Sequence, residues 1–341
     1  MRYNEVGWVD KPNVSDGLWA CWVFNPTYPL CHFFLHSTIS VLSQAHRLVS
    51  LLFWIGITFA KLLFKTGIVI AKPPPRPWEI FSMEDLILVV NCSSSLFKAT
   101  ILNSRSGDIV LSCLAAKLGQ ADAYITFNRR GNRSTISLAE QPDHHGAAAE
   151  LLEETRILGI ERRIRAIGHR VVHGGEHYSD SVRIDDKVIA ALEACIALAP
   201  LHNPANLTGI RAAQAAFPGL PNVAVFDTAF HHTLPEHAYT YAVPRALYRE
   251  HGLRRYGFHG TAYRYVTRET AAMLGKNIAD TALVIAYLGA GSSVAAVLGG
   301  ASQDTSMGLT PLEGLVMDTR SGDIDPGAFE FIENATGLNS A

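Results

Sequence analysis

Apolar and polar positions form the same strand–turn–strand pattern at two places in the chain. In the first, the apolar runs Leu86–Val90 and Phe97–Leu102 flank a polar turn of small residues, Asn91–Ser95. In the second, Leu283–Leu298 repeats this layout around Gly289–Ser293. Short apolar runs bounded by small polar residues predict β-hairpins. Two similar hairpins so far apart in the sequence predict two domains of similar design.

The rest of residues 83–341 alternates between strand-like and helix-like patterns, which predicts the α/β class. The strands are expected at Ile109–Val110, Ala123–Asn128, Ile164–Val172 and Asn222–Phe226. The helices are expected at Gly146–Gly159, Lys187–Leu198, Leu207–Phe217 and Tyr263–Leu274, with a further helix start at Glu330–Asn334. Asn203 as N-cap and Pro204 in the first turn predict how the third helix begins.

The two hairpin turns have a composition that suits phosphate binding. Small residues let backbone N–H groups approach a phosphate, and Lys98, just past the first turn, adds a positive charge. Two such turns facing a shared cleft are typical of nucleotide phosphotransferases. Ordinary hairpin turns also favour Gly and Ser, so a plain structural role stays open at this point.

Residues 1–82 differ from the rest of the chain. Leu48–Ala60 is apolar and uncharged between Arg47 and Lys61, and Pro73–Pro77 resembles a linker. A membrane helix needs about 20 apolar residues, a length reached here only if lysines are tolerated. Three interpretations remain: a non-native extension upstream of Met83, a membrane or interfacial anchor, and a packed accessory segment. The expected domains are 1–82, 83–231 and 232–341.

Composition narrows the function classes. The 341 residues carry a formal net charge of −2 and no long basic run, which argues against nucleic-acid binding. The five cysteines are scattered without CxxC pairs. This usage predicts a reducing compartment, the cytoplasm, and no structural metal.

Five side chains could together carry phosphoryl transfer. Arg170 ends a predicted strand, Asp227 follows another, His259 lies between glycines, and Arg320 is a lone cation among acids. Each has a plainer structural interpretation: an ion pair for the arginines, a cap for Asp227. With Lys98, however, they match a chemistry that works by positioning and by neutralising charge on the transferring group.

The histidines give little support for a metal site. His169, His173 and His177 recur every four residues, but Gly174 and Gly175 would break the helix that zinc binding needs. His231 and His232 are interpreted as surface or core histidines rather than ligands.

Six strings resemble the acetate kinase family over about residues 84–335. They are Asn91–Ser95, Gly168–Glu176, Ala199–Pro204, Val225–His231, Tyr256–Thr261 and Asp304–Gly314. The resemblance implies a two-domain actin-like, ribonuclease H-like kinase fold. It also implies the reaction of ATP with acetate to give ADP and acetyl phosphate, with Mg²⁺ or Mn²⁺ as cofactor, in a homodimer.

The resemblance also implies roles for individual residues. Asn91 would help hold the metal, Lys98 would contact nucleotide phosphate, and Arg170 would bind the substrate carboxylate. Asp227, His259 and Arg320 would be catalytic, the last two by stabilising the transferring phosphoryl group. The second phosphate loop would consist of Tyr287, Leu288, Gly289, Ala290 and Gly291.

Four further residues match the family's small apolar pocket for the acetate methyl: Val172, Leu201, Phe258 and Pro311. Such a pocket separates acids that differ by one methylene by only about 1–3 kcal/mol. A propionate or short-chain fatty acid kinase is therefore the alternative within the same chemistry.

The chain departs from the family pattern at several positions. Ser93 replaces a glycine of the first loop, Tyr287 and Ala290 replace His and Asn of the second, and Tyr263 stands where His is common. Asp318 replaces a glycine before Thr319 and adds negative charge beside a phosphate site.

The family's late segments, an adenosine-binding turn and a metal-binding Glu, have no counterpart in this sequence. We therefore expect an incomplete second domain. Two further hypotheses follow: a catalytically inactive truncated homologue, and a binding module tethered to a membrane through residues 1–82.

Overall fold

The computed structural model describes residues 19–24 and 84–338, which form two compact units. Residues 84–226 make the first unit, and residues 19–24 with 227–338 make the second. The units divide between Phe226 and Asp227, whereas the sequence places the boundary after His231. The domain limits of the sequence analysis stay a prediction.

The extension predicted over residues 1–82 lies outside the described residues, except for 19–24. This includes the apolar run Leu48–Ala60, so the three interpretations of the extension stay open. Among the described helices, none has the length and apolar character needed to cross a membrane.

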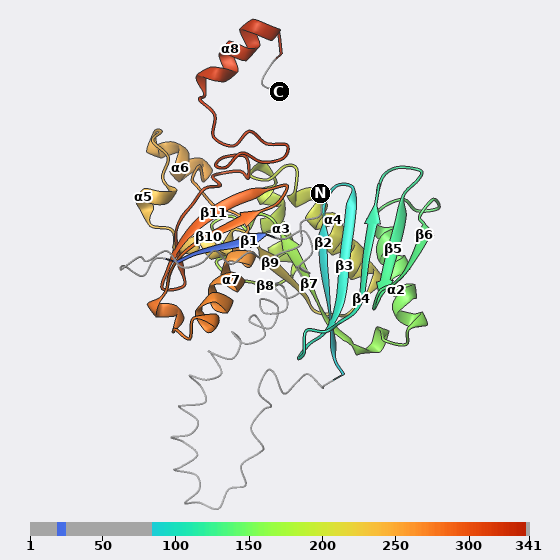
Figure 1. Ribbon diagram of the computed structural model, residues 1–341. Helices are drawn as coiled ribbons and strands as arrows, with labels where there is room; N and C mark the ends of the chain where they lie inside the picture. The colour runs from blue at the N-terminus through green and yellow to red at the C-terminus, as the bar shows by residue number, and fades with distance from the viewer. Residues whose placement is uncertain (1–18, 25–83, 339–341) are drawn as a thin grey trace, which may run out of the picture. The chain divides into compact units, whose positions relative to one another are not determined.

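The first unit is built on an eight-stranded mixed sheet with the strand order β6-β5-β4-β3-β2-β7-β9-β8 (Figure 1). Its strands are β2 (Leu86–Cys92), β3 (Leu96–Asn103), β4 (Ile109–Ala116), β5 (Tyr124–Arg129), β6 (Asn132–Ser137), β7 (Ile164–Val171), β8 (Val182–Arg183) and β9 (Asn222–Phe226). Three helices accompany it: α2 (His144–Ile157), α3 (Asp186–Ala194) and α4 (Asn203–Ala216). The α/β class predicted from the sequence is confirmed.

The first predicted hairpin is confirmed as β2 and β3. Their antiparallel register runs from Leu86 opposite Asn103 to Cys92 opposite Phe97. The hydrogen-bonded ladder therefore extends beyond the apolar runs, and the turn comprises only Ser93–Ser95 rather than the predicted Asn91–Ser95. On its other side β2 pairs in parallel with β7, so the apolar strand lies in the middle of the sheet, as its nearly complete burial requires.

Helix α4 packs on β2 and β7, and its start corrects one prediction. The helix begins at Asn203, and its N-cap is His202, which makes no capping bond with its side chain. Asn203 is not the cap because its amide is used elsewhere. The oxygen accepts the backbone N–H of His173 at 3.2 Å, and the nitrogen donates to the His173 carbonyl at 3.1 Å.

Strand β6 was missed because its sequence carries no apolar signal. Its six residues are mostly exposed, as suits a strand at the edge of the sheet. A tight turn with positive φ at Arg130 and Gly131 connects it to β5. Such turns match the twist of a hairpin.

The second unit contains a four-stranded sheet with the order β1-β10-β11-β12. Its strands are β1 (Trp19–Phe24), β10 (Ala282–Leu288), β11 (Ser292–Leu298) and β12 (Ala301–Thr305). Its helices are α5 (Glu236–Tyr239), α6 (Arg245–His251), α7 (Gly260–Met273) and α8 (Gly327–Thr336), and α7 packs against β10. The second predicted hairpin is confirmed as β10 and β11.

The two sheets repeat one arrangement. In the first unit, β2 pairs antiparallel with β3 and parallel with β7; in the second, β10 pairs antiparallel with β11 and parallel with β1. The register of β1 runs from Trp19 beside Leu283 to Phe24 beside Leu288, directly before the Gly289–Gly291 turn. Residues 19–24 thus hold the place in the second sheet that β7 holds in the first.

Asn206 of α4 joins the carboxyl ends of β2 and β7. Its amide nitrogen donates to the carbonyl of Cys92 at 3.0 Å, and its amide oxygen accepts the N–H of Val172 at 3.0 Å. The residue is buried, so both backbone groups depend on it for a hydrogen-bond partner.

We predict that Asn206→Ala lowers the free energy of unfolding by about 3 kcal/mol, because it leaves a buried carbonyl and a buried N–H unpaired. Thr208 lies two residues further along the same helix, and Thr208→Ala removes only an exposed hydrogen bond to the Pro204 carbonyl. That control is expected to cost less than about 0.5 kcal/mol. Urea unfolding of both variants makes the measurement, and equal losses would contradict the prediction.

Candidate active site

Three polar side chains meet at one end of the first unit's sheet. Asn91 and Lys98 lie directly opposite each other in the β2–β3 ladder, so they share a face. Arg170, near the end of β7, donates from Nη1 to Asn91 Oδ1 at 3.4 Å. Lys98 is exposed and Arg170 partly buried. An exposed ammonium beside a guanidinium suits a bound carboxylate or phosphate.

Two predicted pocket residues lie in the same unit in different surroundings. Val172 is buried, and its backbone is held by Asn206. Leu201 leaves 78% of its surface exposed within the chain. Its apolar side chain is therefore available to a ligand, whereas Val172 acts mainly as part of the core.

The histidines next to Arg170 are structural. His169 Nε2 donates to Asn222 Oδ1 at 2.7 Å, and the N–H of Gly175 donates to His173 Nδ1 at 3.0 Å. Burial lowers the pKa of each ring to about 4. Both rings are therefore neutral near pH 7, and they fix the strand end on which Arg170 lies.

In the second unit, Asp227 directly follows β9 and is only 3% exposed. Its carbonyl accepts the N–H of Gly260 at 2.8 Å. A Cβ at Gly260 would clash with that carbonyl oxygen. Only glycine therefore lets the start of α7 approach the backbone of Asp227 this closely. His259 directly precedes Gly260 in the sequence, so the same contact also fixes the backbone next to His259.

His259 is held over the second turn in an unusual backbone conformation. Its φ of 57° is rare for a residue with a side chain, and such outliers concentrate at functional sites. Its ring stacks on Tyr287 with a centroid distance of 4.1 Å, and Nδ1 lies 2.8 Å from Ser293 Oγ. The other ring nitrogen points to Gly291, because a Cβ there would lie 3.7 Å from His259 Nε2.

Arg320 reaches the same turn from the long loop after β12. A Cβ on Gly291 would lie 3.3 Å from Arg320 Nη1, which also donates to the carbonyl of Pro311 at 2.9 Å. The N–H of Asp318 donates to the carbonyl of Ala290 at 3.3 Å. The structure thus brings His259, Arg320 and the predicted phosphate turn together, with Pro311 beside them.

His231, which the sequence analysis interpreted as a surface or core histidine, is buried and supports this site. Its Nε2 donates to the carbonyl of Phe258 at 2.9 Å, and its Nδ1 accepts from Ser302 Oγ at 2.8 Å. Burial lowers its pKa to about 4, against smaller opposing contributions. The ring therefore fixes the buried Phe258, and with it the turn that carries His259.

The described residues are consistent with a metal ion that takes most of its ligands from the phosphate groups of a nucleotide and few from the protein. Within 84–338, no group of three or more His, Cys, Asp or Glu side chains could hold an ion. Mg²⁺ is commonly bound by one or two protein oxygens together with substrate phosphates and water. Asn91 Oδ1 is such an oxygen, although it accepts a hydrogen bond from Arg170.

Comparisons of the sequence with a family model and with curated proteins point to the same family. A sequence model of the acetokinase family matches residues 86–341. Acetate kinase 1 of Neisseria meningitidis serogroup B is 60% identical over 253 residues, which are 74% of this chain and 64% of that protein. The chain therefore spans just under two thirds of the length of this curated relative.

Solved structures agree with the sequence relatives. A propionate kinase from Francisella tularensis is 42% identical with a TM-score of 0.72, over 75% of this chain and 66% of that one. Porphyromonas gingivalis acetate kinase is 42% identical with a TM-score of 0.71, over 75% of this chain and 65% of that one. The predicted two-domain actin-like kinase fold is confirmed.

The three buried histidines predict how stability depends on pH. The pKa values of His169, His173 and His231 are about 4 in the folded chain, against about 6.5 when unfolded. Between these values the unfolded chain binds more protons, so the free energy of unfolding falls as the pH drops from 6.5 towards 4. Each ring contributes up to roughly 3 kcal/mol.

Urea unfolding at pH 7.5 and 5.5 measures this effect. His169→Gln cannot titrate and is expected to flatten the pH dependence by about one third. A free energy of unfolding that stays constant between the two pH values would contradict the assignment of these rings as neutral.

Proposed function

Because the chain belongs to the acetokinase family, we propose that it transfers the γ-phosphoryl group of ATP to acetate, giving ADP and acetyl phosphate. The observation that carries the proposal is the meeting of His259 Nε2 and Arg320 Nη1 at Gly291 of the phosphate turn. Two donors at one backbone turn form a site for the oxygens of a transferring phosphoryl group.

The first unit would supply the acceptor site. Arg170 presents a planar guanidinium that matches a carboxylate with two parallel hydrogen bonds. Lys98 adds a mobile ammonium on the same face of the hairpin and would contact nucleotide phosphate. Together they would offset the repulsion between an anionic acceptor and an anionic donor.

The second unit would stabilise the transferring group. His259 and Arg320 would donate to oxygens that gain charge as the phosphoryl group moves, and Tyr287, Leu288, Gly289, Ala290 and Gly291 would hold the nucleotide phosphates. Asp227 would act as the catalytic carboxylate, at a position fixed by the contact of its backbone with Gly260. Since this chemistry needs positioning above all, rigid placement of these groups supports the proposal.

Mg²⁺, or Mn²⁺, would supply charge neutralisation between the phosphate groups of ATP. Asn91 is the residue of this chain that we propose to help hold it. Binding would require the Asn91 oxygen to exchange its hydrogen bond with Arg170 for the metal or its water.

Propionate is the second candidate acceptor, and the propionate kinase among the structural neighbours favours it. The resemblance assigns four apolar residues to the methyl group of the acid, and their apolar character suits either acid: Val172, Leu201, Phe258 and Pro311. The ratio of kcat/KM for the two acids decides between them. The homodimer and the cytoplasmic location implied earlier stay predictions.

We predict that the full chain forms acetyl phosphate from ATP, Mg²⁺ and acetate. We also predict that Arg170→Ala lowers kcat/KM for acetate by about 100-fold or more, because the proposed bidentate hydrogen bonds between the guanidinium and the acetate carboxylate are lost. Trapping the product as its hydroxamate measures the rate. Arg165→Ala is the matched control, since Arg165 lies on the same strand but pairs with Asp85 at 3.8 Å.

Loss of activity in Arg170→Ala alone would support the assignment. Equal activity in wild type, Arg170→Ala and Arg165→Ala would contradict it. A folded but inactive wild-type chain would favour the inactive homologue instead.

We also predict that Asp318→Asn lowers the KM for ATP about fivefold. The backbone N–H of Asp318 donates to the carbonyl of Ala290 at 3.3 Å, which places an acidic residue beside the proposed phosphate turn. Removing one like charge in a solvated setting is worth about 1 kcal/mol. Asp323→Asn, on the same loop but bonded through its side chain to Gly314, is the control. An unchanged KM, or a rise, would show that the Asp318 charge does not act on the nucleotide.

A further inference from the structure

A chain of hydrogen bonds runs from the core of the second unit to His259. Ser293, fully buried on β11, lies 2.8 Å from His259 Nδ1 through its hydroxyl. The same hydroxyl makes a short hydrogen bond to the hydroxyl of Tyr263, which is fully buried on α7. All three residues belong to one unit, and the bonds connect α7 and β11 to the turn that carries the imidazole.

The direction of these bonds follows from counting donors and acceptors. The backbone of Tyr287 hydrogen-bonds to the Tyr263 oxygen and lowers its pKa, as an N–H donor does. Burial raises the pKa of Tyr263 well above its ordinary value, so the phenol keeps its hydrogen. Ser293 Oγ is then the acceptor that the contacts of Tyr263 provide.

With Ser293 accepting from Tyr263, we assign the serine hydrogen to the 2.8 Å contact with His259 Nδ1. A nitrogen that accepts a hydrogen bond carries no hydrogen, so the hydrogen of the neutral ring lies on Nε2. Nε2 is the nitrogen that faces Gly291 and Arg320 at the phosphate turn. The ring is also stacked on Tyr287, and a rotation that exchanges its two nitrogens would have to break this contact.

We propose that Tyr263 is a positioning residue that acts through Ser293 to keep the hydrogen of His259 on Nε2, where it can be donated to a phosphoryl oxygen. The donation itself rests on the proposed function, whereas the tautomer does not. Two tyrosines would thereby fix the imidazole, as supporting groups do in other active sites: Tyr263 would set its tautomer, and Tyr287 would set the orientation of its ring.

The test uses the full chain with ¹⁵N-labelled histidine. Two-bond ¹H–¹⁵N spectra distinguish a ring nitrogen that carries a hydrogen from one that does not, and His259→Gln identifies the signals. In the wild type we expect Nδ1 without a hydrogen and Nε2 with one. In Tyr263→Phe, which keeps the ring in the core, we expect a mixture of the two tautomers.

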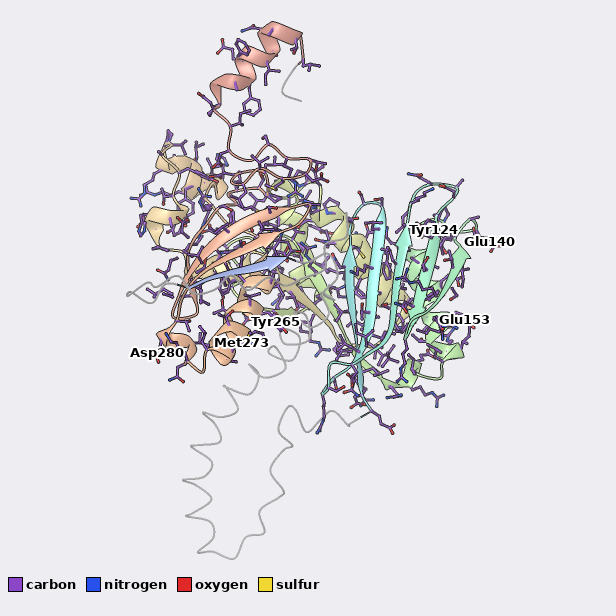
Figure 2. The ribbon with its side chains drawn as sticks, viewed as in Figure 1. Tyr124, Glu140, Glu153, Tyr265, Met273 and Asp280 are labelled. Carbon is purple, nitrogen blue, oxygen red and sulfur yellow. The ribbon has the colours of Figure 1, made fainter. Side chains whose placement is uncertain are left out.

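The kinetic expectation is a fall in kcat of about 10- to 100-fold in Tyr263→Phe with little change in the KM for acetate, as is typical when a supporting partner of a site residue is lost. Tyr265→Phe is the matched control. Tyr265 lies on the same helix (Figure 2), packs against the same apolar cluster, and has no part in the chain of bonds. It is expected to leave both the spectrum and kcat unchanged.

Two results would overturn the proposal: a hydrogen on Nδ1 in the wild type, or the same single tautomer in wild type and Tyr263→Phe. The spectra need no substrate. If the chain proves inactive while the tautomer shifts in Tyr263→Phe, the proposed function fails and the positioning role stands. If activity is present and the tautomer does not respond, the positioning role fails and the function stands.

Discussion

The clamp formed by Asn206 is the interaction on which the first unit's site depends. Parallel strands end in free backbone groups, and at the carboxyl ends of β2 and β7 these groups would be buried without partners. One amide side chain satisfies a carbonyl on one strand and an N–H on the other. Because Asn91 and Arg170 lie beside these two strand ends, the side chain of Asn206 supports the backbone from which both extend.

In the second unit, a histidine side chain provides the hydrogen bonds to buried groups that Asn206 provides in the first. His231 spans from Ser302 on β12 to the carbonyl of Phe258, and so ties the sheet to the turn before α7. A neutral imidazole can donate at one end and accept at the other, which is what a serine hydroxyl and a backbone carbonyl require together. In both units, therefore, the exposed or charged groups of the proposed site are supported by buried, uncharged polar side chains.

Periodicity sufficed to predict the hairpins, the helices α2, α3, α4 and α7, and the strand before Asp227, because these elements bury apolar residues at regular spacing. The short helices α5 and α6 were not predicted, and neither has a buried residue. Periodicity also failed for β6 and β12, whose residues are mostly polar, since an edge strand needs no apolar pattern and the polar residues of β12 are satisfied by partners remote in sequence. The motif residues of the site were predictable as a set. The buried polar residues that support the site could not be predicted in the same way: Asn203, Asn206 and Ser293. A buried amide or hydroxyl acts through its hydrogen-bond partners, and the local sequence does not indicate which partners these are.

The placement of β1 has a consequence for how the chain is made. The first unit is continuous in sequence, so it can fold as soon as it has left the ribosome. The second sheet pairs its first strand, Trp19–Phe24, with β10, which is synthesised only after the whole first unit. Strand β1 can therefore pair only after the hairpin of β10 and β11 has been synthesised, and the loop that this pairing closes contains the whole first unit. Pairing of β1 with β10 should accordingly be the last and slowest event in folding of the second sheet.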